Sequence, residues 1–274
     1  MHNSKFSVLM SVYYKENPLF LHSALASIAN QTILPNEIIL VKDGKLGTEL
    51  EQIIHEWEKK IGNILRIISL DKNRGLGQAL NVGLEHCTYE WIARMDSDDI
   101  ALPERFEKQF AYLVENSDLD ILGSWICEFD NDPAVCSRER RVPASHKHIV
   151  TFARYRNPLN HMTVVFRKGA VEEAGGYMPM NGFEDYFLWM RMLMKGKRFA
   201  NLSEVLVKAR TGQGMIARRQ GWQYAKDELA LEKAAYHLGF WSSTDVVKNF
   251  FIRFIPRLLP VFAVEKLYNL LRKI

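Results

Sequence analysis

The sequence predicts an α/β protein with a mostly parallel, Rossmann-like central sheet flanked by helices, and three observations support this class. Strand and helix patterns alternate along residues 6–100. The predicted strands are almost continuously apolar, which is typical of parallel strands covered on both faces. The polar residues of chemical interest follow these strands, and open parallel sheets bind ligands at the carboxyl ends of their strands.

The alternation can be followed element by element. Apolar residues at helical spacing, such as Leu21, Leu25 and Ile28, predict the first helix. Strands are predicted at 6–12, 37–41, 65–70 and 91–95, and helices at 19–30, 49–60 and 77–85. A longer helix is expected over 103–116, and short strands follow at 120–125 and 162–166, where the regular alternation stops.

Composition limits the possible functions. With 36 Lys and Arg against 32 Asp and Glu, the net charge of +4 is too small to predict nucleic-acid binding over the whole surface. Cys87, Cys127 and Cys136 are odd in number and lack zinc-ligand spacing, which indicates a reducing compartment. The sequence shows neither a signal peptide nor an apolar run of about 18 residues, so we expect a protein that is not exported and does not span a membrane.

The C-terminal residues 246–274 combine positive charge with large apolar side chains. Six basic residues stand against the single acid Glu265: Lys248, Arg253, Arg257, Lys266, Arg272 and Lys273. This pattern predicts an amphipathic helical tail on an anionic membrane surface. The alternative is a pair of helices, broken at Pro256 and Pro260, that packs on the core or on a second subunit.

Asp96, Asp98 and Asp99 directly follow the strand at 91–95. Adjacent carboxylates repel one another and are costly to desolvate, and a divalent cation that also chelates a diphosphate would remove both penalties. A metal site is therefore one interpretation. The other is an acidic turn or helix cap, because residues 100–104 resemble a helix start.

A nucleotide pocket is predicted beside these acids. Asp43 follows the second strand, where its carboxylate could accept hydrogen bonds from a base or ribose, and Ser11 and Tyr13 end the first strand. Stacking of a base on the Tyr13 ring would contribute about 1–3 kcal/mol. Taken singly, an aspartate such as Asp43 is more often a turn residue and a tyrosine such as Tyr13 more often a half-buried aromatic, whereas together the two predict a nucleotide pocket.

The glycine-rich segment 73–78 does not form a dinucleotide fingerprint, because it follows the third strand and lacks the third glycine. Since no Walker sequence occurs either, we expect a metal and basic side chains to hold phosphates, with Arg74 a candidate. Arg210 and Arg218 flank a basic loop that could close over a diphosphate, unless this is only a solvated surface loop.

Three residues of the second half are further candidates. Glu184 and Asp185 open an apolar helix, and one of these carboxylates could be a general base that deprotonates a hydroxyl, although acids also cap helices. His161 precedes a strand and could reach a metal, a phosphate or an acceptor. A lone histidine is more often structural.

Taken in order, the segments 8–14, 25–32, 37–44, 81–84, 95–99 and 184–185 resemble the motifs of family 2 inverting glycosyltransferases of GT-A fold. The resemblance covers residues 6 to about 215. It implies a nucleotide-sugar donor, usually a UDP-sugar, with Mn²⁺ or Mg²⁺ as cofactor. Together with the end of the regular alternation after residue 103 and the basic composition of the tail, it predicts a nucleotide-sugar-binding half (1–102), an acceptor-binding half with the catalytic base (103–218) and a helical basic region (219–274).

The resemblance implies a role for each matching residue. Asp43 contacts uracil and Tyr13 stacks on it, Asp96 lies at the ribose and the metal, Asp98 is the principal metal ligand, and Asp185 is the base. One departure is Lys42, where the family commonly has an acid.

Related bacterial enzymes that build lipopolysaccharide or exopolysaccharide act on lipid-linked acceptors. The resemblance therefore implies a saccharide or lipid-linked acceptor and a cytoplasmic location at the inner face of the cytoplasmic membrane. Two other hypotheses remain, a metal-dependent nucleotidyltransferase and a catalytically silent binding module tethered to the membrane by its tail.

Overall fold

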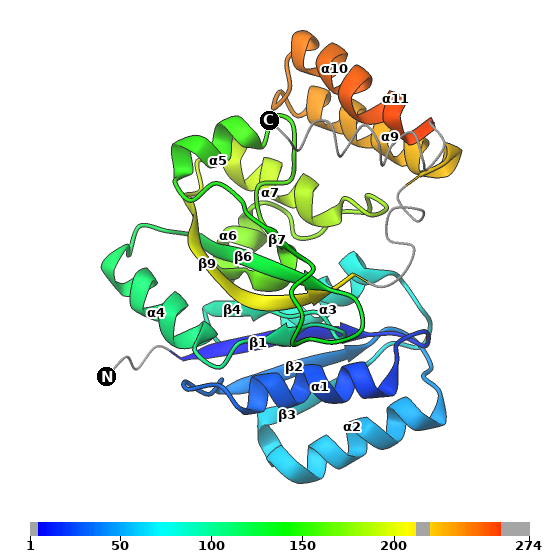
Figure 1. The fold of residues 1–274 in the computed structure, drawn as a ribbon, viewed down its shortest axis with the longest axis vertical. Coiled ribbons are helices and arrows are strands. Elements are labelled where there is room, and N and C mark those ends of the chain that lie inside the picture. Colours follow the sequence, from blue (N-terminus) through cyan, green and yellow to red (C-terminus); the bar gives the residue numbers. More distant parts are fainter. Residues whose placement is uncertain (1–4, 212–219, 259–274) are drawn as a thin grey trace.

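The computed structural model describes residues 5–211 and 220–258, and the strands of this part form one sheet (Figure 1). The strands are β1 (Phe6–Val12), β2 (Glu37–Lys42), β3 (Leu65–Ser69), β4 (Trp91–Arg94), β5 (Ile100–Ala101), β6 (Ile121–Phe129), β7 (Arg138–Arg140), β8 (Val165–Arg167) and β9 (Phe199–Arg210). Their order is β3-β2-β1-β4-β8-β6-β9-β5, with β7 paired to β6. Because the chain runs from β1 to β2 on one side and returns to β4 on the other, a crevice is expected at the carboxyl ends of β1 and β4.

The first half of the sheet is parallel, as predicted. β1 pairs in parallel with both β2 and β4, and β2 pairs in parallel with β3. The apolar residues of β1 and β2 are buried on both faces of the sheet, which explains why these strands are continuously apolar in the sequence.

The second half of the sheet is mixed, because it adds antiparallel pairings of β5, β7 and β8 to the predicted, mostly parallel sheet. β8 runs antiparallel between β4 and β6, whereas β6 and β9 are parallel. Ile100 and Ala101 do not start a helix but form β5, which pairs antiparallel with β9. The twelve-residue β9, which the sequence analysis did not predict, ends at Arg210.

Helices cover both faces of the sheet (Figure 1). They are α1 (Pro18–Ala29), α2 (Thr48–Ile61), α3 (Leu76–His86), α4 (Arg105–Glu115), α5 (His146–Phe152), α6 (Lys168–Glu173), α7 (Glu184–Met194), α9 (Trp222–His237), α10 (Ser243–Asn249) and α11 (Ile255–Leu258). Short 3₁₀ turns lie at Gly62–Ile64 and His161–Thr163. Residues of α1, α2 and α4 share one core with the sheet, and residues of α3, α6 and α7 share the other.

Gly83 explains how closely α3 approaches the sheet. A Cβ at this position would lie 2.4 Å from Leu9 Cδ1 and 2.8 Å from Val41 Cγ2. Any side chain here would force α3 away from β1 and β2. This close contact holds α3, whose first residue Leu76 lines the pocket described below, against β1 and β2.

The C-terminal helices pack on α7 and form a third apolar cluster with it. The chain passes from α10 through a π-helical turn (Phe250–Phe254) into α11, so the break predicted at Pro256 does not occur. Within this region Arg253 forms an ion pair with the fully buried Glu228. Residues 246–258 thus belong to the folded body, and the rest of the predicted tail lies outside the described residues.

None of the helices in the described ranges is long and apolar enough to cross a membrane. Cys127 and Cys136 form a disulfide, with their Cα atoms 5.6 Å apart. The odd number of cysteines indicates a reducing compartment and gives no sign of this bond. Cys127 lies in β6 and Cys136 just precedes β7, and only the pairing of these two strands brings the residues together. The third cysteine, Cys87, is buried.

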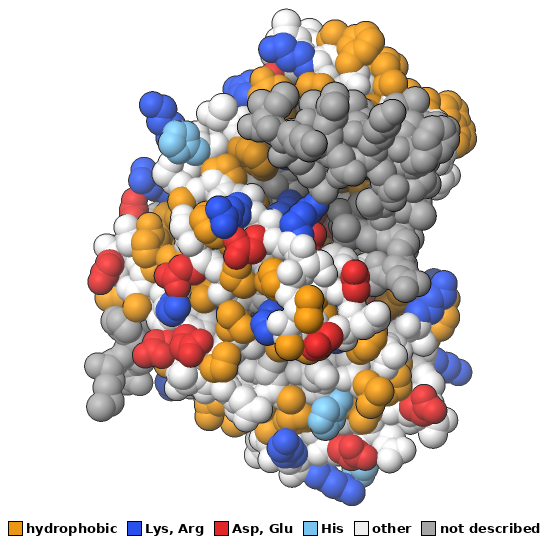
Figure 2. All heavy atoms as spheres, viewed as in Figure 1, with side chains coloured by type: hydrophobic (Ala, Val, Ile, Leu, Met, Phe, Trp, Pro, Cys, Tyr) orange, Lys and Arg blue, Asp and Glu red, His pale blue; other side chains and the backbone are white. Residues whose placement is uncertain are grey.

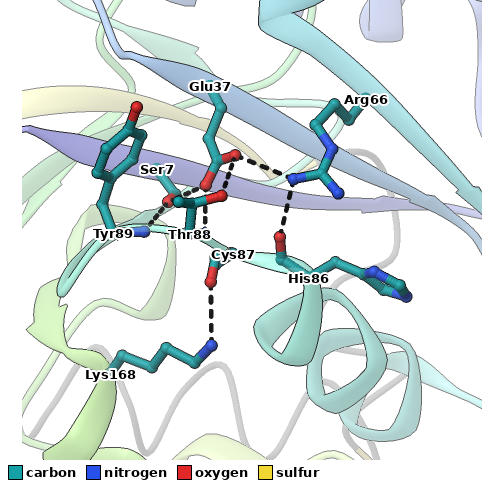
Figure 3. Close-up of polar contacts among 8 residues, drawn as sticks. All are labelled: Ser7, Glu37, Arg66, His86, Cys87, Thr88, Tyr89 and Lys168. Atoms are coloured by element: carbon teal, nitrogen blue, oxygen red, sulfur yellow. Dashed lines mark hydrogen bonds and ion pairs between the residues drawn. The ribbon is translucent and has the colours of Figure 1, made fainter.

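A polar cluster joins the strands at the edge of the sheet opposite the crevice (Figure 3). The buried carboxylate of Glu37 accepts hydrogen bonds from Ser7 Oγ (2.6 Å), Thr88 N (2.5 Å) and Arg66 Nη1 (3.2 Å). Burial alone would raise the pKa of Glu37, but the bonds from Ser7 and Thr88 outweigh it, and the pKa is lowered. The charged Glu37 therefore ties the start of β2 to β1 and to the turn before β4.

Candidate active site

A pocket of about 360 Å³ opens at the carboxyl ends of β1, β2 and β4. Its lining comes from the loops that follow β1, β2, β3 and β4 and from the start of α3. The lining residues are Ser11, Tyr13, Glu16, Asp43, Asn73, Gly75, Leu76, Asp96, Ser97 and Asp98. The structure thus brings five candidates from the sequence analysis, Ser11, Tyr13, Asp43, Asp96 and Asp98, into one cavity.

Asp43 forms the floor of this pocket and is almost completely buried. Its Oδ1 accepts a hydrogen bond from the backbone N–H of Arg74 (2.7 Å), and its Oδ2 accepts one from Gly75 N (3.0 Å). Each carboxylate oxygen keeps a second lone pair, so Asp43 holds the 73–75 loop and can still accept a bond from a ligand. Arg74 contributes its backbone to this contact, and its side chain is exposed.

Tyr13 stands at the rim of the pocket with 41 % of its surface exposed, so its ring is accessible to a flat ligand. Glu16, which the sequence analysis did not single out, also lines the pocket and accepts a hydrogen bond from Ser97 Oγ. No sequence signal marks Glu16, because it lies in the irregular loop between β1 and α1.

The three carboxylates after β4 form a compact acidic cluster. One oxygen from each of Asp96, Asp98 and Asp99 lies within 4.8 Å of the others. Burial and the charges of Asp96 and Glu16 raise the pKa of Asp98 to about 7. The pKa of the buried Asp99 is raised well above its usual value by burial and by both neighbouring aspartates. Such a set of crowded, hard oxygen ligands fits Mg²⁺ or Mn²⁺.

Two arginines surround this cluster. The buried Arg94, which ends β4, forms an ion pair with Asp96. The sequence analysis included Arg94 in the apolar strand and assigned it no role. Arg210 donates from its backbone N–H to Asp99 Oδ1 (2.8 Å) and from Nε to the carbonyl of Asp98 (3.2 Å).

The side chain of Arg210 is held by aromatic rings, since its guanidinium lies 3.7 Å from the ring centre of Phe20 and 4.6 Å from that of Phe129. The antiparallel pairing of β9 with β5 places it beside the acids. Arg218, the other basic candidate, lies outside the described residues.

Glu184 and Asp185 open α7 next to the start of α3. A Cβ at Gly77 would lie 3.2 Å from Glu184 Cγ, so the two helix starts are in contact. Asp185 Oδ2 accepts a hydrogen bond from Asn157 Nδ2 (2.6 Å), and Oδ1 accepts one from the backbone N–H of Tyr186 (2.7 Å). Burial raises the pKa values of both acids, and at Asp185 the Asn157 bond opposes this rise.

His161 lies between aromatic residues. Its Nε2 is 2.9 Å from the hydroxyl of Tyr177, and its ring packs edge-on against Trp189. Burial and the charge of Arg94 hold the pKa of His161 well below its usual value, so the imidazole is neutral at pH 7. His161 therefore links Tyr177 to α7, and it is not among the residues that line the pocket.

The fold and this arrangement of acids define a class of protein. Residues 7–171 match the family model of glycosyl transferase family 2, which is more than half of the chain. The chain belongs to this family, as the sequence motifs indicated, and it is a glycosyltransferase.

Two curated bacterial relatives resemble the chain over nearly its whole length. The amylovoran biosynthesis glycosyltransferase AmsE of Erwinia amylovora is 44 % identical over 271 residues, which cover 98 % of this chain and 99 % of AmsE. The UDP-Gal:alpha-D-GlcNAc-diphosphoundecaprenol beta-1,3-galactosyltransferase of Escherichia coli is 38 % identical over 256 residues, with 93 % and 92 % covered.

A solved structure with the same fold confirms the predicted GT-A class. Residues 1–349 of Staphylococcus aureus TarS, crystallised in complex with UDP-GlcNAc, superpose with a TM-score of 0.66 at 20 % identity. The match covers 92 % of this chain and 72 % of that one.

Proposed function

We propose that this glycosyltransferase moves a sugar from a UDP-sugar to a hydroxyl group of a lipid-linked saccharide, with inversion, in the synthesis of a cell-surface polysaccharide. The main support for this proposal is that two different acidic sites lie at one edge of the sheet. The crowded aspartates after β4 suit a metal-bound diphosphate, and Asp185 at the adjoining start of α7 suits a base.

The donor occupies the pocket at the carboxyl ends of β1, β2 and β4 in this proposal. Tyr13 stacks on the base, Asp43 and Ser11 accept or donate hydrogen bonds at the nucleoside, and Asp96 lies nearest the ribose and the diphosphate. Asp98 and Asp96 would hold Mn²⁺ or Mg²⁺, which when bound supplies positive charge beside the departing diphosphate. Arg210, fixed by its bond to the Asp98 carbonyl, adds a cation at the same edge.

Asp185 acts as the general base. Its carboxylate takes the proton of the acceptor hydroxyl as that oxygen attacks the anomeric carbon, and the diphosphate leaves from the opposite face. One displacement of this kind inverts the configuration. The bonds from Asn157 and from the Tyr186 N–H favour the ionised carboxylate that this role needs.

The acceptor is inferred from the relatives, since the galactosyltransferase of Escherichia coli acts on a sugar linked to a lipid diphosphate and AmsE serves amylovoran biosynthesis. The experiment that tests this proposal incubates the purified protein with Mn²⁺ and one donor, either UDP-galactose, UDP-glucose or UDP-N-acetylglucosamine. The acceptor is α-linked N-acetylglucosamine diphosphate on a short lipid. Mass spectrometry and the anomeric proton coupling should show a β-linked product from an α-linked donor.

Three other outcomes of this assay would contradict the proposal. An α-linked product would exclude inversion. Pyrophosphate-dependent exchange of label into the nucleotide sugar would indicate a nucleotidyltransferase, and the absence of both turnover and UDP release would indicate a silent binding module.

We further propose that the C-terminal helices touch an anionic membrane, which would place the enzyme at the inner face of the cytoplasmic membrane. Val247, Phe251, Ile252 and Leu258 are 46–62 % exposed on α10, the π-turn and α11, and Lys248 is exposed beside them. Hydrophobic side chains gather over these helices at the top of Figure 2. An exposed apolar surface with adjacent positive charge is typical of interfacial binding.

Replacing both Phe251 and Ile252 with serine should weaken binding to anionic vesicles at least about tenfold, because each buried apolar side chain contributes about 1.5–3 kcal/mol. Flotation with phosphatidylglycerol vesicles measures the bound fraction. Deletion is a poorer test, since Asn249 and Phe254 are buried against the rest of the protein.

The matched control replaces two apolar residues with similar exposure elsewhere, Leu34 (55 %) and Val114 (48 %), and should bind as wild type. If wild-type protein does not float at low salt, or if both double variants bind equally, the described helices do not form the membrane contact.

A further inference from the structure

The segment 153–157, which connects α5 to the turn at His161, is held at four of its five backbone carbonyls by side chains from distant elements. Each of these contacts is a direct hydrogen bond. They are Tyr186 Oη to Ala153 O (2.8 Å), Asn249 Nδ2 to Arg154 O (2.9 Å), Arg253 Nη1 to Tyr155 O (3.0 Å) and Arg140 Nη2 to Asn157 O (3.2 Å). Two of the donors, Asn249 and Arg253, come from the C-terminal helices. These helices therefore also hold a segment that is not part of the proposed membrane contact.

The last residue of this segment, Asn157, has its amide orientation determined by two different partners. Its Oδ1 accepts a hydrogen bond from the backbone N–H of Leu159 (3.3 Å), and its Nδ2 donates to Asp185 Oδ2 (2.6 Å). An N–H can only donate, so Oδ1 must face Leu159 and the NH₂ group must face the carboxylate. Asn157 is therefore a fixed donor to Asp185.

We propose that Asn157 is a positioning residue for the general base: it fixes the orientation of the Asp185 carboxylate and keeps it ionised, and the C-terminal helices hold the segment that ends at Asn157. This inference rests on the proposed role of Asp185. With Oδ2 engaged by Asn157 and Oδ1 by the Tyr186 N–H, both carboxylate oxygens are fixed by donors before any acceptor arrives.

Several charged and titratable groups lie close enough to Asp185 to influence its pKa. Arg140 and Arg94 favour the ionised carboxylate, whereas burial opposes it. Glu184, Tyr177 and Tyr186 also face it, and Asp185 contributes to the raised pKa of each of these three. Burial raises the pKa of both tyrosines well above their usual value, so neither titrates near neutral pH. The titration of Glu184 must therefore be distinguished from that of Asp185 in the measurement.

The test is a carbon-13 NMR titration of the Asp185 carboxyl in the full chain, assigned with Asp185→Asn and repeated in a Glu184→Gln background. In Asn157→Ala the pKa of Asp185 should rise by about one to two pH units, because a hydrogen bond to a charged group is lost. Asn157→Asp keeps the shape of the side chain but adds a like charge, so the pKa should rise further.

Activity supplies a second readout. With the transfer assay above, the acidic limb of the kcat/KM profile for Asn157→Ala should move to higher pH by the same amount, with the donor KM unchanged. A merely structural asparagine would lower the rate equally at all pH values. Asn116→Ala is the matched control, since this partly buried amide donates to the Tyr112 carbonyl (2.9 Å) away from the site.

An unchanged Asp185 titration in folded Asn157→Ala or Asn157→Asp would overturn the proposal. If Asn157→Ala does not fold, the isosteric Asn157→Asp carries the same comparison. The NMR result needs no turnover, so it stands even if the donor or acceptor is assigned wrongly. Failure of the proposed function would instead appear as full transfer by Asp185→Asn.

Discussion

Asp185→Asn should lower kcat for transfer about 100- to 10,000-fold while donor affinity stays at the wild-type value, since this is the usual contribution of a general base. The amide preserves the size of the side chain but cannot accept the proton of the attacking hydroxyl. Steady-state transfer kinetics measure the loss, and calorimetry with UDP and Mn²⁺ measures donor-site affinity.

The neighbouring Glu184→Gln is the matched control, because it removes an adjacent acid that opens the same helix. It should retain most of the activity if Asp185 alone is the base. Wild-type turnover in Asp185→Asn, or an equal loss in Glu184→Gln, would contradict the assignment.

Asp98→Ala should abolish the Mn²⁺-dependent part of UDP binding without unfolding the protein. Asp98 is one of the three aspartates of the predicted metal site. The other two, of which Asp96 is ion-paired to Arg94, leave too few free oxygens for tight binding. Calorimetric titration of UDP with and without Mn²⁺ gives the two affinities. Retained dependence on Mn²⁺ would exclude Asp98 as a principal ligand.

The same substitution has an expected effect on metal-free stability. Burial and nearby acids raise the pKa of Asp98 from 3.8 to about 7 in the folded protein, so this carboxyl destabilises the fold increasingly as the pH rises between these two values, and the full penalty is present above pH 7. Removing the carboxylate should therefore leave the melting temperature in EDTA at pH 8 unchanged or higher. Asp118→Ala, which removes an exposed acid paired with Arg198, is the control.

Several elements could be predicted because their signals are local. The strands at 6–12 and 37–41 were correct within one residue, since parallel strands buried on both faces are continuously apolar. Asp43 and Asp98 follow such strands, so the rule that ligands bind at carboxyl ends placed both at one crevice. The structure does bring them into the same pocket.

Other elements depend on partners far along the chain. Ile100 and Ala101 look like a helix start beside Pro103, yet they pair with Lys208 and Val207 of β9. The disulfide between Cys127 and Cys136 likewise needs the β6–β7 pairing. Local propensity is a weak prior when such tertiary pairing competes with it.

The sequence by itself determined the family, the alternation of strands and helices in the first half of the chain, and the acidic residues that follow the ends of strands. Only the tertiary structure decided which neutral or basic side chains lie close enough to these acids to affect their ionisation. Arg94 sits inside an apolar strand, and Asn157 lies 28 residues before Asp185, so neither has a local signal. The reason is physical: a residue type and its neighbours in sequence fix local conformation, whereas the ionisation of a carboxylate depends on burial and on groups within a few ångströms in space.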